Sequence, residues 1–106
     1  ALAAIEGAKA VPLLLDRLNS DKEPRVRWST LLALEPFQEM HPELLATFIE
    51  SMRDHSTEVR MAAVDIVSRI DDPAARQAIQ TRYQKELRPD VRVVLKVALE
   101  RIGLED

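Results

Sequence analysis

The dipeptide Val-Arg occurs three times at nearly constant spacing, with Val26, Val59 and Val91 lying 33 and then 32 residues apart. After each copy, apolar residues recur at intervals of three and four, which is the pattern of one buried face of an α-helix. A unit of about 32 residues that returns along a chain is typical of a stacked repeat protein. In such a protein each unit buries its apolar face against the next unit.

Polar turns and prolines divide each unit into two helices. Asp72 is placed to cap a helix, and Pro73 to occupy its first position, where a missing N–H costs nothing. Gly103 follows the last helical segment, as a C-terminal glycine commonly does. Three more prolines lie where a helix is expected to begin: Pro24, Pro42 and Pro89. Each unit is therefore predicted to contain two antiparallel helices joined by a short turn.

Residues 1–106 are predicted to form a single domain of such units. Gly7 is expected to end an incomplete unit at 1–7, and Pro12 to lie in the first turn of the next helix. Complete units are expected at about 8–37, 38–71 and 72–106. We therefore expect about three helix pairs and a partial N-terminal helix, in a fragment of a longer array.

The composition favours helix and excludes several classes of protein. The chain has two glycines, one Trp, one Tyr, two Phe and no cysteine, so disulfides and thiolate metal sites are excluded. No apolar run approaches the ~20 residues that span a bilayer, and we take the cytoplasm as the default location. The net charge of −3 argues against nucleic acid, because phosphate-binding domains usually carry a basic excess. The expectation is an all-α protein without a membrane partner.

The three copies share a polar turn, the Val-Arg pair, and then small or aliphatic residues that end in Leu or Ile. This pattern resembles HEAT repeats, and its short period is similar to the compact HEAT-like repeats of the phycobilisome-lyase type. Ankyrin and tetratricopeptide repeats have similar lengths, but their signature residues are absent. The resemblance covers essentially the whole chain. It implies a right-handed α-α superhelix, a HEAT-like solenoid, whose second helices line a concave side.

The resemblance also implies that the arginine of each Val-Arg pair braces neighbouring repeats. These arginines and the acidic turn residues expected as their partners are Arg27, Arg60 and Arg92, and Asp21, Asp54 and Glu86. A planar guanidinium can donate to carbonyls and to a carboxylate together, which suits a structural role. The alternative, a ladder that binds phosphates, would require more uncompensated positive charge nearby. We therefore favour the structural role.

On a helical wheel, the residues two and six positions after each valine point away from the predicted buried face. They form a strip across the second helices: Trp28, Leu32, Met61, Asp65, Val93 and Val97. Exposed apolar surface that contains Trp and Met is typical of a binding site, so we expect a partner to bind here. In the alternative, Trp28 and Leu32 pack against the preceding helix or against a missing repeat.

The sequence contains no catalytic or metal-binding constellation. His41 and His55 flank one predicted helix, so they lie on the order of 20 Å apart and cannot share a metal. Helix capping explains Asp71 and Asp72 better than acid–base chemistry does. We therefore predict a non-catalytic scaffold, with no cofactor, that binds a protein or peptide on its concave side. Two alternatives stay open: a part in bilin attachment, which the lyase resemblance implies, and nucleic-acid binding on a HEAT-like surface.

The last predicted helix is apolar on nearly every side. Its apolar residues are Val91, Val93, Val94, Leu95, Val97, Ala98, Leu99 and Ile102. A terminal repeat usually has a polar outer face, so this helix is expected either to pack on a further repeat or to pair with another chain. We favour the further repeat, and we predict that the isolated chain self-associates through a terminal helix.

Overall fold

The computed structural model describes the backbone of residues 2–103 and the side chains of residues 8–103. This part of the chain is helical and contains no strand, which confirms the predicted all-α class. Its elements, in order, are α1 (Leu2–Ser20), α2 (Pro24–Leu34), the 3₁₀ helix η1 (Glu35–Phe37), α3 (Leu44–Ser51), α4 (Thr57–Ser68), α5 (Pro73–Lys85) and α6 (Pro89–Arg101). None of these helices is both long enough and apolar enough to cross a bilayer.

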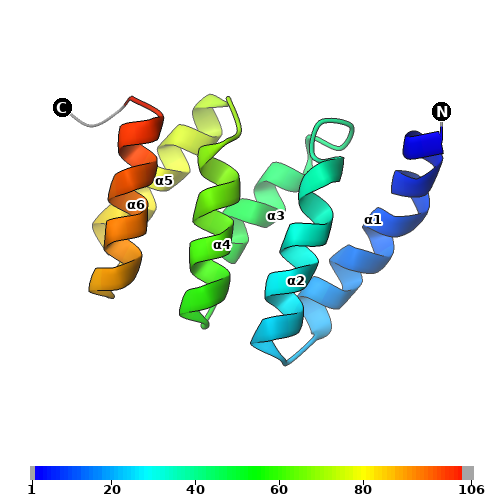
Figure 1. Ribbon diagram of the computed structural model, residues 1–106, viewed down its shortest axis with the longest axis horizontal. Helices are drawn as coiled ribbons and strands as arrows, with labels where there is room; N and C mark the ends of the chain where they lie inside the picture. Colours follow the sequence, from blue (N-terminus) through cyan, green and yellow to red (C-terminus); the bar gives the residue numbers. More distant parts are fainter. Residues whose placement is uncertain (1, 104–106) are drawn as a thin grey trace.

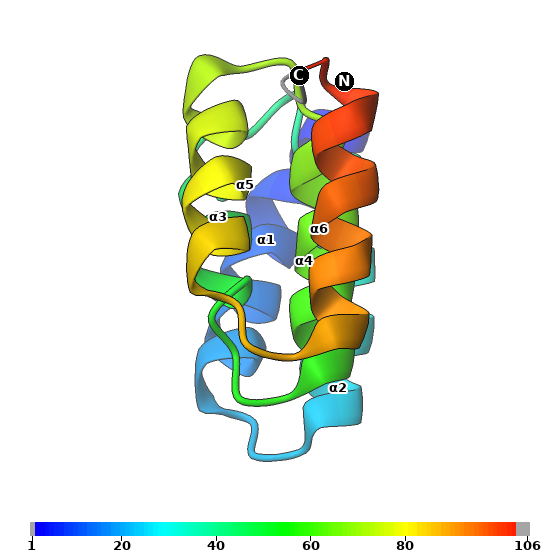
Figure 2. The ribbon, with the colours of Figure 1, turned by 90° about the vertical axis from the view of Figure 1, so that its left-hand side faces the viewer.

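The helices form two layers (Figures 1 and 2). The second helices of the three pairs, α2, α4 and α6, lie side by side in one layer, and α1, α3 and α5 form the other. The Cα atoms extend over 43 × 29 × 14 Å, with the long axis running from pair to pair. This is the predicted solenoid, in which each pair packs only on its neighbours.

Local capping explains why several helices begin where they do. The Asp72 carboxylate accepts a hydrogen bond of 2.7 Å from the Ala74 N–H, and Pro73 occupies the first position of α5, as the sequence predicts. The Ser56 hydroxyl accepts from the Val59 N–H at the start of α4. At the other end of the chain, Gly103 has a φ of 74°, the left-handed conformation that glycine adopts after a helix.

The structure differs from the prediction in the first helix. A break was expected at Gly7, with Pro12 in the first turn of a new helix, but α1 continues from Leu2 to Ser20 with Pro12 inside it. A single glycine inside a helix costs only about 1 kcal/mol relative to alanine, and the flanking residues are strong helix formers. The expected unit at 1–7 and the next unit therefore share one helix, while the side chains of residues 1–7 lie outside the described part.

The third helix is shorter than predicted. A helix was expected to begin at Pro42, but α3 spans Leu44–Ser51. The N–H of Leu44 donates to the carbonyl of His41 over 2.9 Å, so a tight turn with a bond between residues three apart precedes the helix. With 8 residues, α3 is the shortest α-helix of the described chain, against 19 residues in α1 and 13 in α5.

Equivalent positions in the repeats are buried to different extents because the array has ends. Val59 and Val91 are fully buried, whereas Val26 is only half-buried. Ala33 is likewise exposed, although its equivalent in α4, Ile66, is buried. The reason is that α4 and α6 each pack on the second helix of the preceding pair. In contrast, α2 is the first of the three second helices and packs only on α4 within this layer. The predicted buried face is therefore correct for α4 and α6 and incomplete for α2.

The sequence suggested a last helix that is apolar on nearly every side, but α6 has a polar outer face. In α4, Val64 and Ser68 are buried where the following pair packs, and the equivalent residues of α6 are Lys96 and Glu100, both exposed. The apolar residues of α6 face the core, apart from Val93 and Val97, which are exposed. The C-terminal end of the stack is thus more polar than its internal junctions. Self-association through a terminal helix stays a prediction.

Arginine side chains connect each pair to the next. Arg27 donates through Nε and Nη2 to the Asp54 carboxylate over 2.8 and 2.9 Å, and through Nη1 to the Asp21 carbonyl over 3.1 Å. Arg60 repeats this arrangement, with bonds of 3.0 and 3.3 Å to the Glu86 carboxylate and of 2.8 Å to the Asp54 carbonyl. Each guanidinium therefore joins the turn before its own helix to the acidic turn residue of the following pair.

The third arginine has a different set of contacts. Arg92 donates through Nη1 to the backbone carbonyls of Tyr83 and Glu86, and its guanidinium lies 4.2 Å from the centre of the Tyr83 ring. Two of the expected acidic partners, Asp54 and Glu86, accept arginine hydrogen bonds through their carboxylates. Asp21 offers its carbonyl instead, while its carboxylate accepts from the Glu23 N–H.

The buried link between Arg60 and Glu86 should contribute strongly to stability. The Glu86 side chain is only 3% exposed, so removing Arg60 leaves a buried carboxylate without its principal partner. We expect Arg60→Ala to lower the free energy of unfolding by about 3 kcal/mol. Arg69→Ala, which removes two partly exposed ion pairs, with Glu35 and with Asp65, should cost at most about 1 kcal/mol. Urea unfolding followed by circular dichroism measures both, and equal losses would contradict the structural role of Arg60.

The same ladder predicts a dependence of stability on pH. Burial alone would raise the pKa of the Asp54 carboxyl, but hydrogen bonds from Arg27 and from the Ser56 N–H, with the charges of Arg27 and His55, lower this pKa. The folded pKa therefore lies below the unfolded value of about 3.9. The ionised carboxylate stabilises the fold above that value, and this contribution is lost as pH falls through the folded pKa.

Asp54→Asn should remove this contribution. We expect the variant to be less stable near pH 7, and the difference from the natural chain to shrink as pH falls from about 5 to about 2. Urea midpoints measured at matched pH values give the comparison. If the difference in midpoint stays constant over this range, Asp54 does not carry a titration-dependent part of the stability.

Candidate functional site

The six residues that the sequence predicts as a binding strip all lie on the second-helix layer. The helices α2, α4 and α6 lie side by side (Figure 1), and the six residues hold equivalent positions in them, so they form two rows across the three helices. The rows are Trp28, Met61 and Val93, and Leu32, Asp65 and Val97. These six residues are called the second-helix strip below.

Most of the apolar side chains in the second-helix strip are open to solvent. Trp28 is 39% exposed, Leu32 40%, Val93 63% and Val97 49%. Met61, between them, is half-buried and packs against the core. The strip therefore presents apolar surface at α2 and again at α6, with less of it at α4. Trp28 and Leu32 each keep about two fifths of their surface exposed, and neighbouring residues cover the rest. That a partner binds here stays a prediction.

The helical wheel suggested that Asp65 is a single charge in an apolar surface, but its carboxylate has charged partners. Its carboxylate forms ion pairs with Arg69 on its own helix and with Arg101 of α6, the latter at 3.3 Å. Arg69 also lies 3.3 Å from Glu35, beyond the end of α2, and Arg101 donates to the Ser68 hydroxyl over 2.8 Å. Two arginines and two carboxylates thus alternate across the three second helices, and their charges compensate one another.

A shallow groove separates α4 from α6 beside the strip. Its walls include Val64 and Asp65 from α4, and Val93, Val97 and Arg101 from α6. The groove encloses about 230 Å³, below the ~300–1,000 Å³ of sites that hold a small-molecule ligand or cofactor. With valines along its length and an ion pair at one end, it has the size and polarity to accept a side chain of a protein partner.

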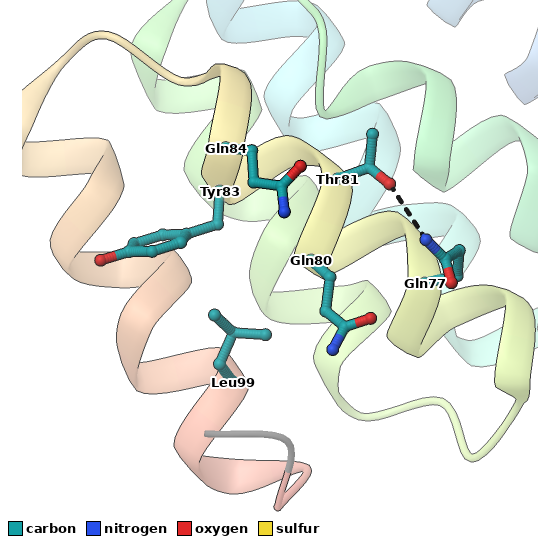
Figure 3. Close-up of a pocket in the computed structure, with 6 residues that line it drawn as sticks. All are labelled: Gln77, Gln80, Thr81, Tyr83, Gln84 and Leu99. Carbon is teal, nitrogen blue, oxygen red and sulfur yellow. Dashed lines mark hydrogen bonds between the residues drawn. The ribbon is translucent and has the colours of Figure 1, made fainter. Parts of the chain in front are cut away.

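A second hollow lies between α5 and α6, on the C-terminal side of the stack (Figure 3). Three glutamine side chains of α5 surround it, and Gln77 donates to the Thr81 hydroxyl over 3.4 Å. Tyr83 and Leu99 complete the wall. The amides and the hydroxyls, including the Tyr83 phenol, can hold a ligand by hydrogen bonds.

The two histidines lie in separate turns. His41 lies in the turn before α3, with Nδ1 3.3 Å from a Glu43 carboxylate oxygen. His55 lies in the turn before α4, where its carbonyl accepts from Arg60. Among the described residues, no cluster of three or more His, Cys, Asp or Glu side chains has the arrangement of a metal site. The candidate site is thus a surface for recognition, built on equivalent positions of three neighbouring helices.

The comparisons agree with this architecture. The family model for HEAT repeats matches residues 11–100, from the middle of α1 to the last turn of α6. Neither a curated protein nor a solved structure matches the chain significantly. The match covers most of the chain without distinguishing a phycobilisome-lyase subtype. From its repeated helix pairs, its solenoid structure and this match, the chain belongs to the HEAT repeat family.

Proposed function

We propose that this chain is a non-catalytic scaffold segment that binds a protein or peptide along the second-helix strip. HEAT repeats generally mediate protein–protein interaction, and the strip gives that general role a place in this chain. The observation that carries the proposal is the exposure of Trp28, Leu32, Val93 and Val97 at equivalent positions of parallel helices. Apolar side chains that are grouped on a surface mark interaction sites, whereas apolar side chains scattered singly are common on any protein.

The energetics of the strip favour a partner with its own apolar side chains. Fully burying one aliphatic or aromatic side chain contributes about 1.5–3 kcal/mol, so even partial burial of four gives useful affinity. Trp28 is the only tryptophan, and tryptophan is among the residues that most often dominate binding energy. The neighbouring arginines, Arg69 and Arg101, are already paired with carboxylates. This face therefore offers little free positive charge to the phosphates of a nucleic acid.

We further infer that residues 1–106 act as one unit in this role. The supporting observation is that the strip crosses all three helix pairs, and the arginine links join each pair to the next. A partner that contacts both Trp28 and Val93 must span α4. Its binding therefore depends on the distance between α2 and α6, which these links maintain. The proposal of a longer array, of which this unit is a part, is compatible with the half-buried Val26 at the N-terminal end of the stack.

Peptide selection tests the proposed function directly. Random peptides displayed on phage are selected on the natural chain, and the affinity of selected peptides is then measured for a variant with Leu32→Asp and Val93→Asp. We expect these substitutions to weaken strip-binding peptides about tenfold or more, because they place two carboxylates in an apolar contact. Binding should also shift the fluorescence of Trp28 to shorter wavelength as its ring loses contact with water.

A matched control is available on this chain. Leu13 and Leu87 are 73% and 90% exposed and lie outside the strip, so Leu13→Asp with Leu87→Asp makes the same chemical change elsewhere. This control should leave peptide affinity within about twofold of the natural chain. A library that yields only peptides insensitive to Leu32→Asp and Val93→Asp would show that the strip is not the binding surface.

A further inference from the structure

A groove crosses the other layer of the molecule, between α3 and α5. Its walls are the C-terminal end of α3 with the turn that follows, and the C-terminal half of α5. The groove encloses about 480 Å³ and is separate from the second-helix strip, which lies on the layer formed by α2, α4 and α6 (Figure 2). Six of its residues carry the argument: Ile49, Met52, Arg53, Ala78, Arg82 and Lys85.

The floor of this groove is apolar. Ile49 and Ala78 are half-buried and pack against the core, and Met52 between the helices is only 2% exposed. A partner side chain placed on this floor would be removed from water on several sides. Aliphatic groups therefore gain more here than on a flat surface, at ~25 cal/mol for each Å² of apolar surface buried.

The rim of the groove is basic. The Arg53 side chain is 69% exposed, and its ion pair with Glu50, at 3.6 Å, is itself exposed. An exposed pair of this length contributes little and leaves the guanidinium accessible to another anion. Lys85, on the opposite wall, is also exposed, and its side-chain ammonium forms no hydrogen bond or ion pair with another described residue.

Arg82 adds a cation whose charge is only partly compensated. Its Nε atom is buried and has no hydrogen-bond partner among the described residues. It lies 3.6 Å from the Glu86 carboxylate, but that carboxylate already accepts two hydrogen bonds from Arg60. Two guanidinium groups thus share one buried carboxylate. An additional anion near Arg82 would be stabilised by charge and by geometry.

The local charge contrasts with the charge of the whole chain. Four cations, Arg53, Arg60, Arg82 and Lys85, lie near two carboxylates, Glu50 and Glu86, which leaves a local charge of about +2. The chain as a whole has a net charge of −3. A partner that is attracted to this groove must therefore be recognised locally, since long-range attraction between the acidic chain and an acidic partner is absent.

We propose that the groove between α3 and α5 binds an acidic amphipathic segment of a protein partner. One face of that segment places aliphatic side chains on Ile49, Met52 and Ala78, and its carboxylates pair with Arg53, Arg82 and Lys85. An apolar floor with a basic rim is complementary to this chemistry, as in recognition of an amphipathic helix by a groove. A nucleic acid fits less well, because Ile49, Met52 and Ala78 offer no polar contact to sugars or phosphates.

The test uses two synthetic peptides and the whole chain labelled with ¹⁵N. Both peptides carry leucine at helical spacing, and they differ only in having glutamate or lysine at the remaining positions. We expect the glutamate peptide to bind saturably and to shift the amide resonances of α3 and α5, including Ile49 and Thr81. The lysine peptide should bind at least about tenfold more weakly, because like charges meet at the rim.

Charge reversal at the rim locates the binding site. Arg53→Glu with Lys85→Glu should weaken the glutamate peptide at least about tenfold, and both side chains are exposed, so the fold should be retained. The matched control is Lys22→Glu with Arg25→Glu, an equal change of charge on exposed residues near the start of α2. This control, and the strip variant with Leu32→Asp and Val93→Asp, should leave the affinity for the glutamate peptide unchanged.

Three results would overturn the proposal. The first is no saturable binding of the glutamate peptide up to about 1 mM, which means a binding free energy weaker than about −4 kcal/mol. The second is equal affinity for the natural chain and for the variant with Arg53→Glu and Lys85→Glu. The third is displacement of the glutamate peptide by a single-stranded oligonucleotide that binds the groove more tightly than the peptide does. That result would assign the groove to phosphate instead.

Discussion

Burial between neighbouring pairs holds this molecule together, because no helix pair hides its apolar residues by itself. Val64 is fully buried in α4 only because the following pair packs on it, and Val59 faces the preceding pair in the same way. Val26, in a helix with a second-layer neighbour on one side, is only half-buried. The same constraint that makes the fold extend in one direction leaves the outer faces of both layers available for partners.

Apolar contact alone does not determine how one pair is rotated on the next, since aliphatic surfaces tolerate small shifts. Directional bonds from Arg27 to Asp54 and from Arg60 to Glu86 supply that restriction, across 27 and 26 residues of sequence. Each guanidinium also donates to a turn carbonyl, so it fixes the turn and the following pair together. The rows of the second-helix strip stay aligned because these links keep the second helices in equivalent positions.

The features that the sequence predicts well are local, and those that it misses depend on tertiary neighbours. The cap at Asp72 and the turn at Gly103 follow from neighbouring residues, and the structure has both. The continuity of α1 through Gly7 does not follow from local preference, which is too weak to decide it. The partner of Asp65 in α6, Arg101, lies 36 residues away, so a helical wheel drawn for one helix could not identify it. The groove between α3 and α5 combines side chains of two separate helix pairs, so no single predicted helix indicates it.

The two layers offer different surfaces. The second helices have nearly equal lengths of 11, 12 and 13 residues, and equivalent positions of the strip recur on all three, with less apolar surface at α4 than at α2 and α6. The groove of the other layer is formed by the C-terminal end of α3 and the C-terminal half of α5. Equivalent positions thus give a surface that runs along the array, whereas the groove is local to two neighbouring helices. Because the two surfaces lie on separate layers, a partner on the second-helix strip would leave the proposed site between α3 and α5 open.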